Sequence, residues 1–258
     1  MMIQNKINYV LHLADNALIL GHRLSEWCGH GPVLEQDMAM TNIALDFIGE
    51  ARNFYQYAAE LKADGSTEDS LAYLRDAYDF KNCLLVEQPN GDFAKTIARQ
   101  FLYDSYHFYF LEKLCESSDE RLSAIAEKTL KEATYHLRWS SDWVIRLGDG
   151  TEESHQRIQL AFNDLWYFSG EFLTKTSLEK EINTSLPDRH TEGVIVDLDE
   201  IKSSVLAKRK TIFEEATLKM PTDAWMQKGG KEGKHTEHLG FLLAEMQFIQ
   251  RAYPNSAW

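Results

Sequence analysis

Apolar residues recur at intervals of three and four along most of the chain. In the first 62 residues this repeat is formed by Leu11, Ala14, Leu18 and Leu24, and then by Met38, Ile43, Phe47 and Phe54. Such spacing places apolar side chains on one face of an α-helix. Alternating β-branched runs are nearly absent, and residues 194–196 (VIV) are the one short candidate strand. The pattern predicts an all-α protein.

Breaks between the periodic segments give the expected helix boundaries. Five prolines occur, and four of them lie beside Gly, Asn or Asp, where chain reversals are favoured. Helices are expected at residues 5–28, 33–62, 68–79, 92–116, 119–147, 152–182, 198–219 and 235–252. At about 1.5 Å per residue, four of these span roughly 30 Å. The lengths favour an elongated antiparallel helix bundle, with additional C-terminal helices packed around it.

No feature of the chain divides it into separate domains. Repeats of fixed period and long linkers rich in Pro, Ser or Gly are absent from the sequence. Residues 185–199 mix Pro, Gly and charges, and we expect an excursion between helices there. Residues 1–258 are therefore expected to form a single domain.

Composition and charge narrow the class of protein. Hydrophobic residues make up 44% of the 258 residues and charged residues 26%, so a folded chain is expected rather than a disordered one. The formal net charge of -13 disfavours binding to nucleic acid. No segment approaches the roughly 18 apolar residues of a membrane span, and the first residues lack a leader pattern. We expect a cytoplasmic protein with no membrane partner.

Three cysteines lie far apart in the sequence, at Cys28, Cys83 and Cys115. They show neither a C-x-x-C pair nor metal-ligand spacing, and their number is odd. We expect them to be buried, small apolar side chains in a reducing compartment.

Four acidic residues stand inside apolar helical stretches, at Asp15, Asp46, Asp104 and Glu132. The first two are 31 residues apart and the last two 28. About 30 residues is what two antiparallel helices and a short turn need for two positions to meet at one depth. The spacing predicts that each pair meets on the bundle axis.

Carboxylates in this arrangement are typical of di-iron bundles, where Glu-x-x-His on two helices supplies the imidazole ligands. Here Gly49 follows Asp46 at that interval, and Tyr135 follows Glu132. Loss of both imidazoles disfavours a functional metal site. The acids are then expected to form a buried polar network with neighbours such as Arg52, His107 or His136, because an isolated buried carboxylate is costly. His107 and His136 as unorthodox ligands stay an alternative.

A basic glycine-rich stretch precedes the last predicted helix. Residues 227–234 (QKGGKEGK) resemble a phosphate-binding loop, but His235 stands where that motif needs Ser or Thr. We expect a flexible loop. His235 and His238 are three apart without the HExxH spacing of zinc proteases, and Thr236 is expected to cap the following helix.

Large aromatic residues crowd two regions, and the first holds Phe101, Tyr103, Tyr106, Phe108, Tyr109 and Phe110. The second holds Trp139, Trp143, Phe162, Trp166, Tyr167 and Phe168. Aromatic residues at every angular position indicate either an unusually wide core or a face buried against another protein. Both interpretations are open on the pattern alone.

Several longer strings match a known family. They are residues 24–30 (LSEWCGH), 46–54 (DFIGEARNF), 85–91 (LVEQPNG), 131–138 (KEATYHLR), 235–240 (HTEHLG) and 243–247 (LAEMQ). With these strings the chain resembles, nearly end to end, the C subunits of bacterial ring 1,2-phenylacetyl-CoA epoxidases.

The resemblance implies a ferritin-like bundle that acts in aerobic phenylacetate degradation. In that family, a homologous A subunit holds the di-iron centre and inserts one oxygen atom into the ring of phenylacetyl-CoA. The C subunit is the companion without metal or other cofactor, and it supports the A subunit structurally. B and reductase subunits complete the complex. No catalytic residue is therefore expected in this chain.

The resemblance also implies contacts to the acyl-CoA at the interface of the two bundles. The first set matches Asp79, Phe80, Lys81 and Asn82, and the second matches Lys180, Glu181 and Ile182. In such a site Lys81 would meet a CoA phosphate, and Phe80 would pack on an apolar part of the ligand.

Three hypotheses follow from the sequence. The first is a non-catalytic structural subunit of the epoxidase complex. The second is a di-metal oxygenase or ferroxidase that uses the four acids with His107 or His136. The third is a binding module outside this pathway, based on the aromatic surface alone.

Overall fold

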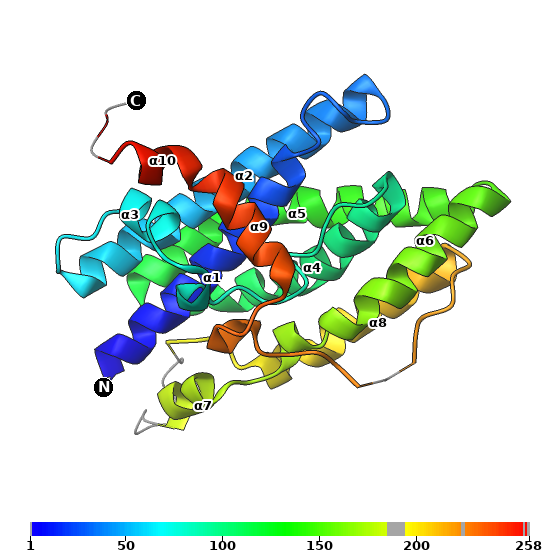
Figure 1. Ribbon diagram of the computed structural model, residues 1–258. Coiled ribbons are helices and arrows are strands. Elements are labelled where there is room, and N and C mark those ends of the chain that lie inside the picture. Colours follow the sequence, from blue (N-terminus) through cyan, green and yellow to red (C-terminus); the bar gives the residue numbers. More distant parts are fainter. Residues whose placement is uncertain (1, 185–193, 223–224, 255, 257–258) are drawn as a thin grey trace. The chain divides into compact units, whose positions relative to one another are not determined.

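The structure is a computed structural model that describes residues 2–184, 194–222, 225–254 and 256. Helices and turns account for all regular structure in these ranges, and no strand occurs among them (Figure 1). The all-α prediction is confirmed, and the described residues 194–196 are irregular, with a bend at 194–195, and do not form a strand. None of the described helices is long and apolar enough to cross a membrane.

Two compact units emerge from the contacts within the chain. The first comprises residues 1–89 and 228–258, and the second comprises residues 90–227. The chain thus leaves the first unit after Pro89 and returns to it at Lys228. A single domain over residues 1–258 stays a prediction.

The first unit is built on two long helices that pack along each other, α1 (Met2–Ser25) and α2 (Leu34–Lys62). The shorter elements are α3 (Glu68–Tyr73), η1 (Ala77–Asp79), η4 (Gly230–Glu232), α9 (Glu237–Met246) and α10 (Phe248–Ala252). A capping box between Thr67 and Ser70 begins α3. Residues 10–20 of α1 are all buried, so this helix forms the core of the unit.

The second unit is organised around α4 (Phe93–Leu114), which packs against α5 (Glu120–Gly148), α6 (Glu152–Leu165) and α8 (Leu198–Glu215). The remaining elements are η2 (Trp166–Phe168), η3 (Glu171–Leu173) and α7 (Ser177–Thr184). Side-chain caps at Asp92, Asp119, Thr151 and Asp197 begin the four main helices. These caps explain why the predicted starts are nearly right.

The helix predicted at residues 152–182 is wrong, because it ends at Leu165 and short 3₁₀ turns follow. The Ser169 backbone N–H and hydroxyl both donate to the Trp166 carbonyl, at 3.0 and 2.8 Å. Gly170 follows, and a Cβ there would lie 2.7 Å from the Met226 side chain. Hydrogen bonds from Ser169 and close packing at Gly170 therefore replace the backbone hydrogen bonds that a continued helix would make.

Residues 68–79 and 235–252 are also divided into two elements each. The Gln247 side chain donates to the carbonyls of Ala72 and Arg75, at 3.2 and 3.0 Å. Gln247 is the residue between α9 and α10, while Ala72 and Arg75 lie where α3 ends. One polar side chain thus joins both helix breaks, through a contact distant in sequence.

The aromatic residues resolve mainly into core. Phe101, Phe162 and Phe213 form one cluster, with ring centroids 6.1 Å apart for the first pair and 4.5 Å for the second. Tyr106 stacks on Phe172 at 4.9 Å. Of the twelve aromatics in the two crowded regions, only Tyr167 is exposed. The wide-core interpretation is therefore favoured.

The expectation of three buried cysteines is correct for one. Cys83 is buried, Cys115 is half-buried, and Cys28 is exposed in the turn that follows α1. Burial raises the pKa of the Cys115 thiol, and nearby Glu127 raises it further. This thiol is therefore protonated at neutral pH and is a poor nucleophile.

Candidate functional site

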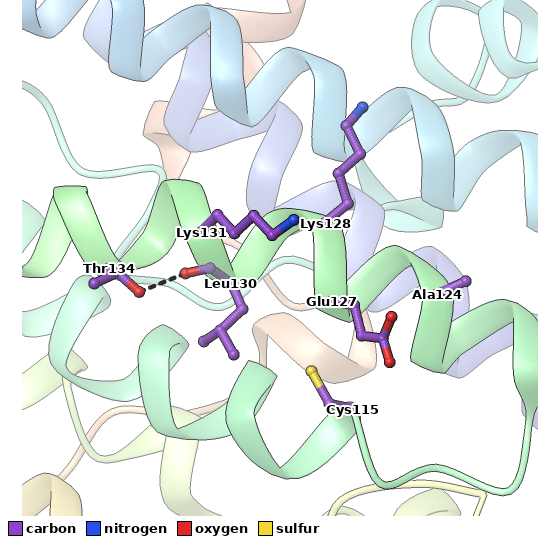
Figure 2. A pocket seen from close by; sticks show the side chains of 7 residues that line it. All are labelled: Cys115, Ala124, Glu127, Lys128, Leu130, Lys131 and Thr134. Atoms are coloured by element: carbon purple, nitrogen blue, oxygen red, sulfur yellow. Dashed lines mark hydrogen bonds between the residues drawn. The ribbon is translucent and has the colours of Figure 1, made fainter.

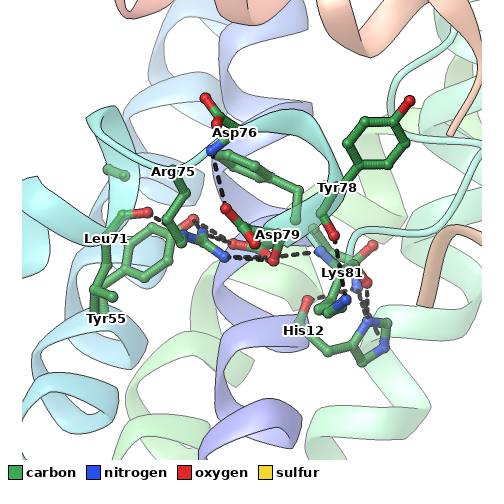
Figure 3. A network of polar contacts seen from close by, with 12 residues as sticks. His12, Tyr55, Leu71, Arg75, Asp76, Tyr78, Asp79 and Lys81 are labelled. Carbon is green, nitrogen blue, oxygen red and sulfur yellow. Dashed lines mark hydrogen bonds and ion pairs between the residues drawn. The ribbon is translucent and has the colours of Figure 1, made fainter. Parts of the chain in front are cut away.

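Residues 80–83, which follow η1, run in extended conformation beside α1, and we call them the extended segment. The Lys81 N–H donates to Asp15 Oδ2 at 2.7 Å, and the Cys83 N–H donates to Asn16 Oδ1 at 2.8 Å. His12 Nδ1 lies 2.7 Å from the Lys81 carbonyl oxygen, which can only accept a hydrogen bond. Positions 12, 15 and 16 share one face of α1. Three side chains of this helix thus fix the backbone of residues 81–83, and Figure 3 shows His12 beside Lys81.

Asp15 is fully buried and is engaged on both oxygens. Tyr55 from α2 donates its hydroxyl to Oδ1 at 2.5 Å, and Arg75 forms an ion pair with the same oxygen. Arg75 also donates to Oδ2 at 3.2 Å and to the Asp79 carbonyl at 3.0 Å. We call Asp15, Tyr55 and Arg75 the Asp15 network (Figure 3).

The electrostatics of the Asp15 network favour a charged Arg75. Burial opposes its charge, but Asp15 and Tyr55 outweigh that effect and raise the pKa of the guanidinium above its usual value. Burial first, and then the Asp15 charge, raise the pKa of the Tyr55 phenol well above its ordinary value. A cation and two hydrogen-bond donors therefore already meet the Asp15 carboxylate, and they leave it unsuited to bind a metal.

A second buried carboxylate, Glu87, holds the other side of the extended segment. Its Oε1 accepts from the Thr236 N–H and hydroxyl at 2.7 and 2.8 Å, and its Oε2 accepts from Asn82 Nδ2 at 3.0 Å. His235 lies between Oε2 of Glu87 and the Phe80 carbonyl, with both ring nitrogens at 2.9 Å. Glu87 and His235 thus join the start of α9 to the extended segment.

This arrangement changes two expectations for the glycine-rich stretch. Thr236 is the N-cap residue of α9, but its hydroxyl bonds Glu87 and makes no cap bond. The loop is not open, because a Cβ on Gly230 would lie 2.2 Å from the Asn82 carbonyl oxygen. Gly233 has φ 82°, and a Cβ at this position would lie 2.5 Å from the Tyr78 carbonyl oxygen. Glycine is required at both positions for the loop to pack on residues 78–82.

The predicted acyl-CoA residues of the first set differ in accessibility. The Phe80 side chain is fully buried and lies under the Arg75 guanidinium, 4.2 Å from its ring centroid. Asn82 is also fully buried, against Glu87. Phe80 is therefore a core residue of the first unit, and its contact with a ligand stays a prediction. Asp79 is exposed and Lys81 half-buried, so these two present side chains at the surface.

The second set lies in the other unit, on α7. Lys180 and Glu181 are exposed there. The side chain of Ile182 lies outside the described residues. Contacts of these three with a ligand stay a prediction.

The remaining ligand-like positions do not pair as the spacing predicted. Asp104 on α4 is buried and accepts from Gln100 Nε2 and from Ser140 Oγ, both at 2.7 Å. Ser140 is eight residues beyond Glu132 on α5, about 12 Å along the helix. Similarly, Asp15 meets Tyr55 on α2, nine residues beyond Asp46. Each predicted partner is off by roughly two turns.

The surroundings of these residues do not fit a metal centre of the expected kind. Asp46 and Glu132 are half-buried, Gly49 has open space around its Cβ position, and Tyr135 is 48% exposed. Burial raises the pKa of Asp104 to about 6, although His136, Ser140 and His107 act in the opposite direction. Over the part of the chain that the structure describes, no three His, Cys, Asp or Glu side chains gather closely enough to hold a metal ion. The donor set does not fit a di-iron centre.

Two surface hollows were not foreseen from the sequence. One, of about 590 Å³, lies on α5 beside the end of α4 and is lined by Cys115, Ala124, Glu127, Lys128, Leu130, Lys131 and Thr134 (Figure 2). The other, of about 500 Å³, lies in the first unit between residues 76–77 and the α9–α10 region. Neither contains a predicted acyl-CoA residue.

Sequence reasoning also missed Arg75, Tyr55 and Glu87 as partners. Glu87 alone gave a signal, because it follows three apolar residues, 84–86 (LLV), within one of the family-like strings. Its partners Asn82 and His235 are 5 and 148 residues away. No periodic pattern relates positions at such separations.

The class of the protein follows from comparison with known sequences. The family described as phenylacetic acid catabolic protein matches residues 2–258, so the chain belongs to this family. The family is ferritin-like, in agreement with the all-helical structure.

A particular relative is the C subunit of 1,2-phenylacetyl-CoA epoxidase from Escherichia coli (strain K12). It is 49% identical over 250 residues, which cover 97% of this chain and 98% of the relative. The resemblance seen in the sequence strings is thereby confirmed.

Proposed function

We propose that this chain is a non-catalytic structural subunit of a phenylacetyl-CoA epoxidase complex. In this role it binds and supports a homologous subunit that holds the di-iron centre, and it contributes contacts to the acyl-CoA. The likeness to a protein named as the C subunit of such an epoxidase supports the assignment to the complex. The B and reductase subunits would complete the assembly.

One observation carries the non-catalytic part of the proposal, and it is the Asp15 network. The carboxylate at the first ligand-like position is bound by Arg75 and Tyr55, so its lone pairs and its charge are already satisfied. Gly49 and Tyr135 supply no imidazole at the positions where one is needed. A buried carboxylate in this chain therefore acts as a structural anchor for residues 75–81.

The acyl-CoA contact is proposed at Lys81. Its backbone is fixed from both sides by His12 and Asp15, while its ammonium group lies 3.4 Å from the Tyr78 carbonyl at the surface. An ammonium on a fixed backbone is suited to a CoA phosphate, because the backbone does not have to be ordered on binding.

Co-expression with the catalytic subunit tests the catalytic question. We expect Asp46→Ala combined with Glu132→Ala to leave both assembly and epoxide formation near wild-type levels. Loss of turnover with assembly intact would contradict the proposal and favour a di-metal oxygenase that uses these acids. Failure of the wild-type chain to co-purify with that subunit would favour a binding module outside the pathway.

Steady-state kinetics of the assembled complex test the ligand contact. We expect Lys81→Gln to raise KM for phenylacetyl-CoA several-fold, with kcat nearly unchanged, because a phosphate contact is the same in ground and transition states. Lys202→Gln on α8 makes the same change at an exposed lysine outside the predicted acyl-CoA residues, and this control should leave KM unchanged. An unchanged KM in Lys81→Gln would remove Lys81 from the site.

A further inference from the structure

The imidazole of His235, which precedes α9, lies between two oxygen atoms. Its Nε2 is 2.9 Å from the Phe80 carbonyl oxygen, which can only accept a hydrogen bond, so this nitrogen carries a proton. Its Nδ1 is 2.9 Å from Oε2 of Glu87. Either His235 is a doubly protonated imidazolium that donates to a carboxylate, or it is neutral and accepts from a protonated Glu87. The surroundings of Glu87 decide between these two states.

The carboxyl group of Glu87 is surrounded by hydrogen-bond donors. Its Oε1 accepts from the N–H and the hydroxyl of Thr236, at 2.7 and 2.8 Å, and its Oε2 accepts from Asn82 Nδ2 at 3.0 Å. Hydrogen bonds of this kind favour the charged form of a carboxyl group. The Glu87 side chain has no exposed surface, so its charge needs a counter-charge close by. Within the ranges that the structure describes, its one ion pair is with His235. The shared proton therefore resides on the imidazole.

An arginine of α1 approaches Glu87 but does not pair with its carboxylate. Arg23 donates through Nε and Nη2 to the backbone carbonyl of Glu87, at 3.2 and 2.8 Å. Its Nη1 pairs with the carboxylate of Glu26 at 2.8 Å. The guanidinium thus fixes the main chain at residue 87 and compensates a different acid, which leaves the side-chain charge of Glu87 to His235.

The imidazolium acts on the backbone that presents Lys81. It donates to the carbonyl of Phe80, while His12 and Asp15 on α1 hold the carbonyl and the N–H of the next residue, both at 2.7 Å. The extended segment is thus held by α1 and by the chain that leads into α9. Beside an ionised Glu87, a neutral His235 would have only one N–H for its two acceptors. One of the two contacts that it makes would then be lost.

We propose that His235 is a positioning residue that is doubly protonated at neutral pH. Its imidazolium joins the Glu87 carboxylate to the Phe80 carbonyl and so holds Lys81 in the place where it meets the acyl-CoA. His235 touches no ligand and acts through the backbone of the extended segment. The link to the acyl-CoA rests on the proposed function, whereas the charge of His235 stands on the geometry of the first unit alone.

The protonation state can be measured on the unmodified chain. In a chain labelled with ¹⁵N-histidine, long-range ¹H–¹⁵N NMR spectra at pH 7 distinguish ring nitrogens that carry a proton from those that do not. We expect both ring nitrogens of His235 to carry one. Its signals are assigned by their loss in His235→Gln, and His238→Gln is the matched control that keeps them. A deprotonated Nδ1 or Nε2 at position 235 of the wild-type chain overturns the proposal.

A second set of spectra tests the role of Glu87. Glu87→Gln removes the buried negative charge, and its amide can donate to Nδ1, so His235 should become neutral and keep a proton on Nε2 alone. Glu26→Gln removes the acid that pairs with Arg23 and should leave both protons on His235. An imidazolium that persists in Glu87→Gln would show that Glu87 is not its counter-charge, and the proposed pairing would be wrong.

Kinetics of the assembled complex test the positioning role. We expect His235→Gln to raise KM for phenylacetyl-CoA several-fold with kcat nearly unchanged, while His238→Gln leaves both unchanged. Because His235 acts through Lys81, adding His235→Gln to Lys81→Gln should change KM by less than about twofold. Effects on KM that multiply, or no effect of His235→Gln where Lys81→Gln has one, would exclude the positioning role.

Failure of this inference can be told apart from failure of the ligand contact at Lys81. If Lys81→Gln leaves KM unchanged, the ligand contact is wrong, and the positioning role is wrong with it. If Lys81→Gln raises KM but the spectra show a neutral His235, the ligand contact stands and the inference about His235 is wrong.

Discussion

At the scale of single residues, Arg75 stands beside Asp15 and neutralises a carboxylate that has no access to water. A buried charge is tolerated only where a partner and hydrogen bonds compensate for its lost hydration. Arg75 provides both, and it also bonds the carbonyls of Leu71 and Asp79. The same guanidinium therefore compensates the buried charge of Asp15 on α1 and holds the chain that follows α3 in place.

Removal of the guanidinium should be strongly destabilising. We expect Arg75→Met to lower the free energy of unfolding by about 3–5 kcal/mol, because Asp15 is left buried with no counter-charge. Asp15→Asn in the same background should recover part of that loss. Arg52→Met removes an arginine whose side chain is 68% exposed and should cost less than about 1 kcal/mol. Urea unfolding of these three variants and of Asp15→Asn alone measures these values, and additive effects at positions 15 and 75 would contradict the coupling.

Asp104 should make stability depend on pH in a defined direction. Burial raises the pKa of its carboxyl to about 6 in the folded chain, above the ordinary 3.8. Between these values the folded state binds more protons than the unfolded state, so stability falls as pH rises from about 4 to about 6. The loss is on the order of 3 kcal/mol and is complete above that window.

Asp104→Asn isolates this effect. The amide keeps the shape of the carboxylic acid but has no charge, and Ser140 can turn its hydroxyl toward the Leu137 carbonyl, 3.4 Å away. The variant should therefore gain stability relative to wild type as pH rises through the window. Thermal unfolding at pH 4 and pH 7 measures the difference, and a gain that is equal at both pH values would count against a raised pKa.

At the scale of elements, the helices begin where sequence signals are strong and end where distant contacts decide. Asp92, Asp119, Thr151 and Asp197 all act as side-chain caps, and such residues can be recognised from sequence. The ends of α3 and α9 depend instead on Arg75 and Gln247, whose partners lie in other elements. Helix propensity alone does not contain that information.

Packing of the glycine-rich loop on residues 78–82 gives a test at this scale. We expect Gly230→Ala to destabilise the protein by about 1–3 kcal/mol, because its methyl group would lie 2.2 Å from the Asn82 carbonyl oxygen. Gly240→Ala in α9 has open space at its Cβ position, and it should stabilise by about 0.5–1 kcal/mol. Differential scanning calorimetry of both variants measures the contrast. Equal effects would mean that the loop does not pack closely on this segment.

At the scale of the whole molecule, the all-helical class and most helix starts could be predicted from the 3.6-residue pattern and the caps. The depth at which facing helices meet could not be predicted from that pattern. Asp15 meets Tyr55 and not Asp46, and Asp104 meets Ser140 and not Glu132. A residue count predicts such pairs only if the connection brings the two helix ends to the same height. Here the helices joined by residues 26–33 and by residues 115–119 are offset from the predicted register by about two turns.

The candidate site could be predicted only in part from the sequence, because it also depends on contacts between residues that are distant along the chain. Missing imidazoles at Gly49 and Tyr135 could be seen directly, and they disfavoured an iron site of the usual kind. The occupation of Asp15 by Arg75 depends on a contact across 60 residues. The burial of Phe80 likewise involves its packing under that same guanidinium.

The most direct measurement is the iron content of this chain, purified alone and then as a complex co-expressed with its catalytic partner. We expect less than about 0.1 iron per chain alone, since Arg75 and Tyr55 already satisfy Asp15, and about two irons per pair of subunits in the complex. Wild-type chain that purifies alone with two irons would contradict the central claim. The carboxylates of this chain would then form an active site of their own.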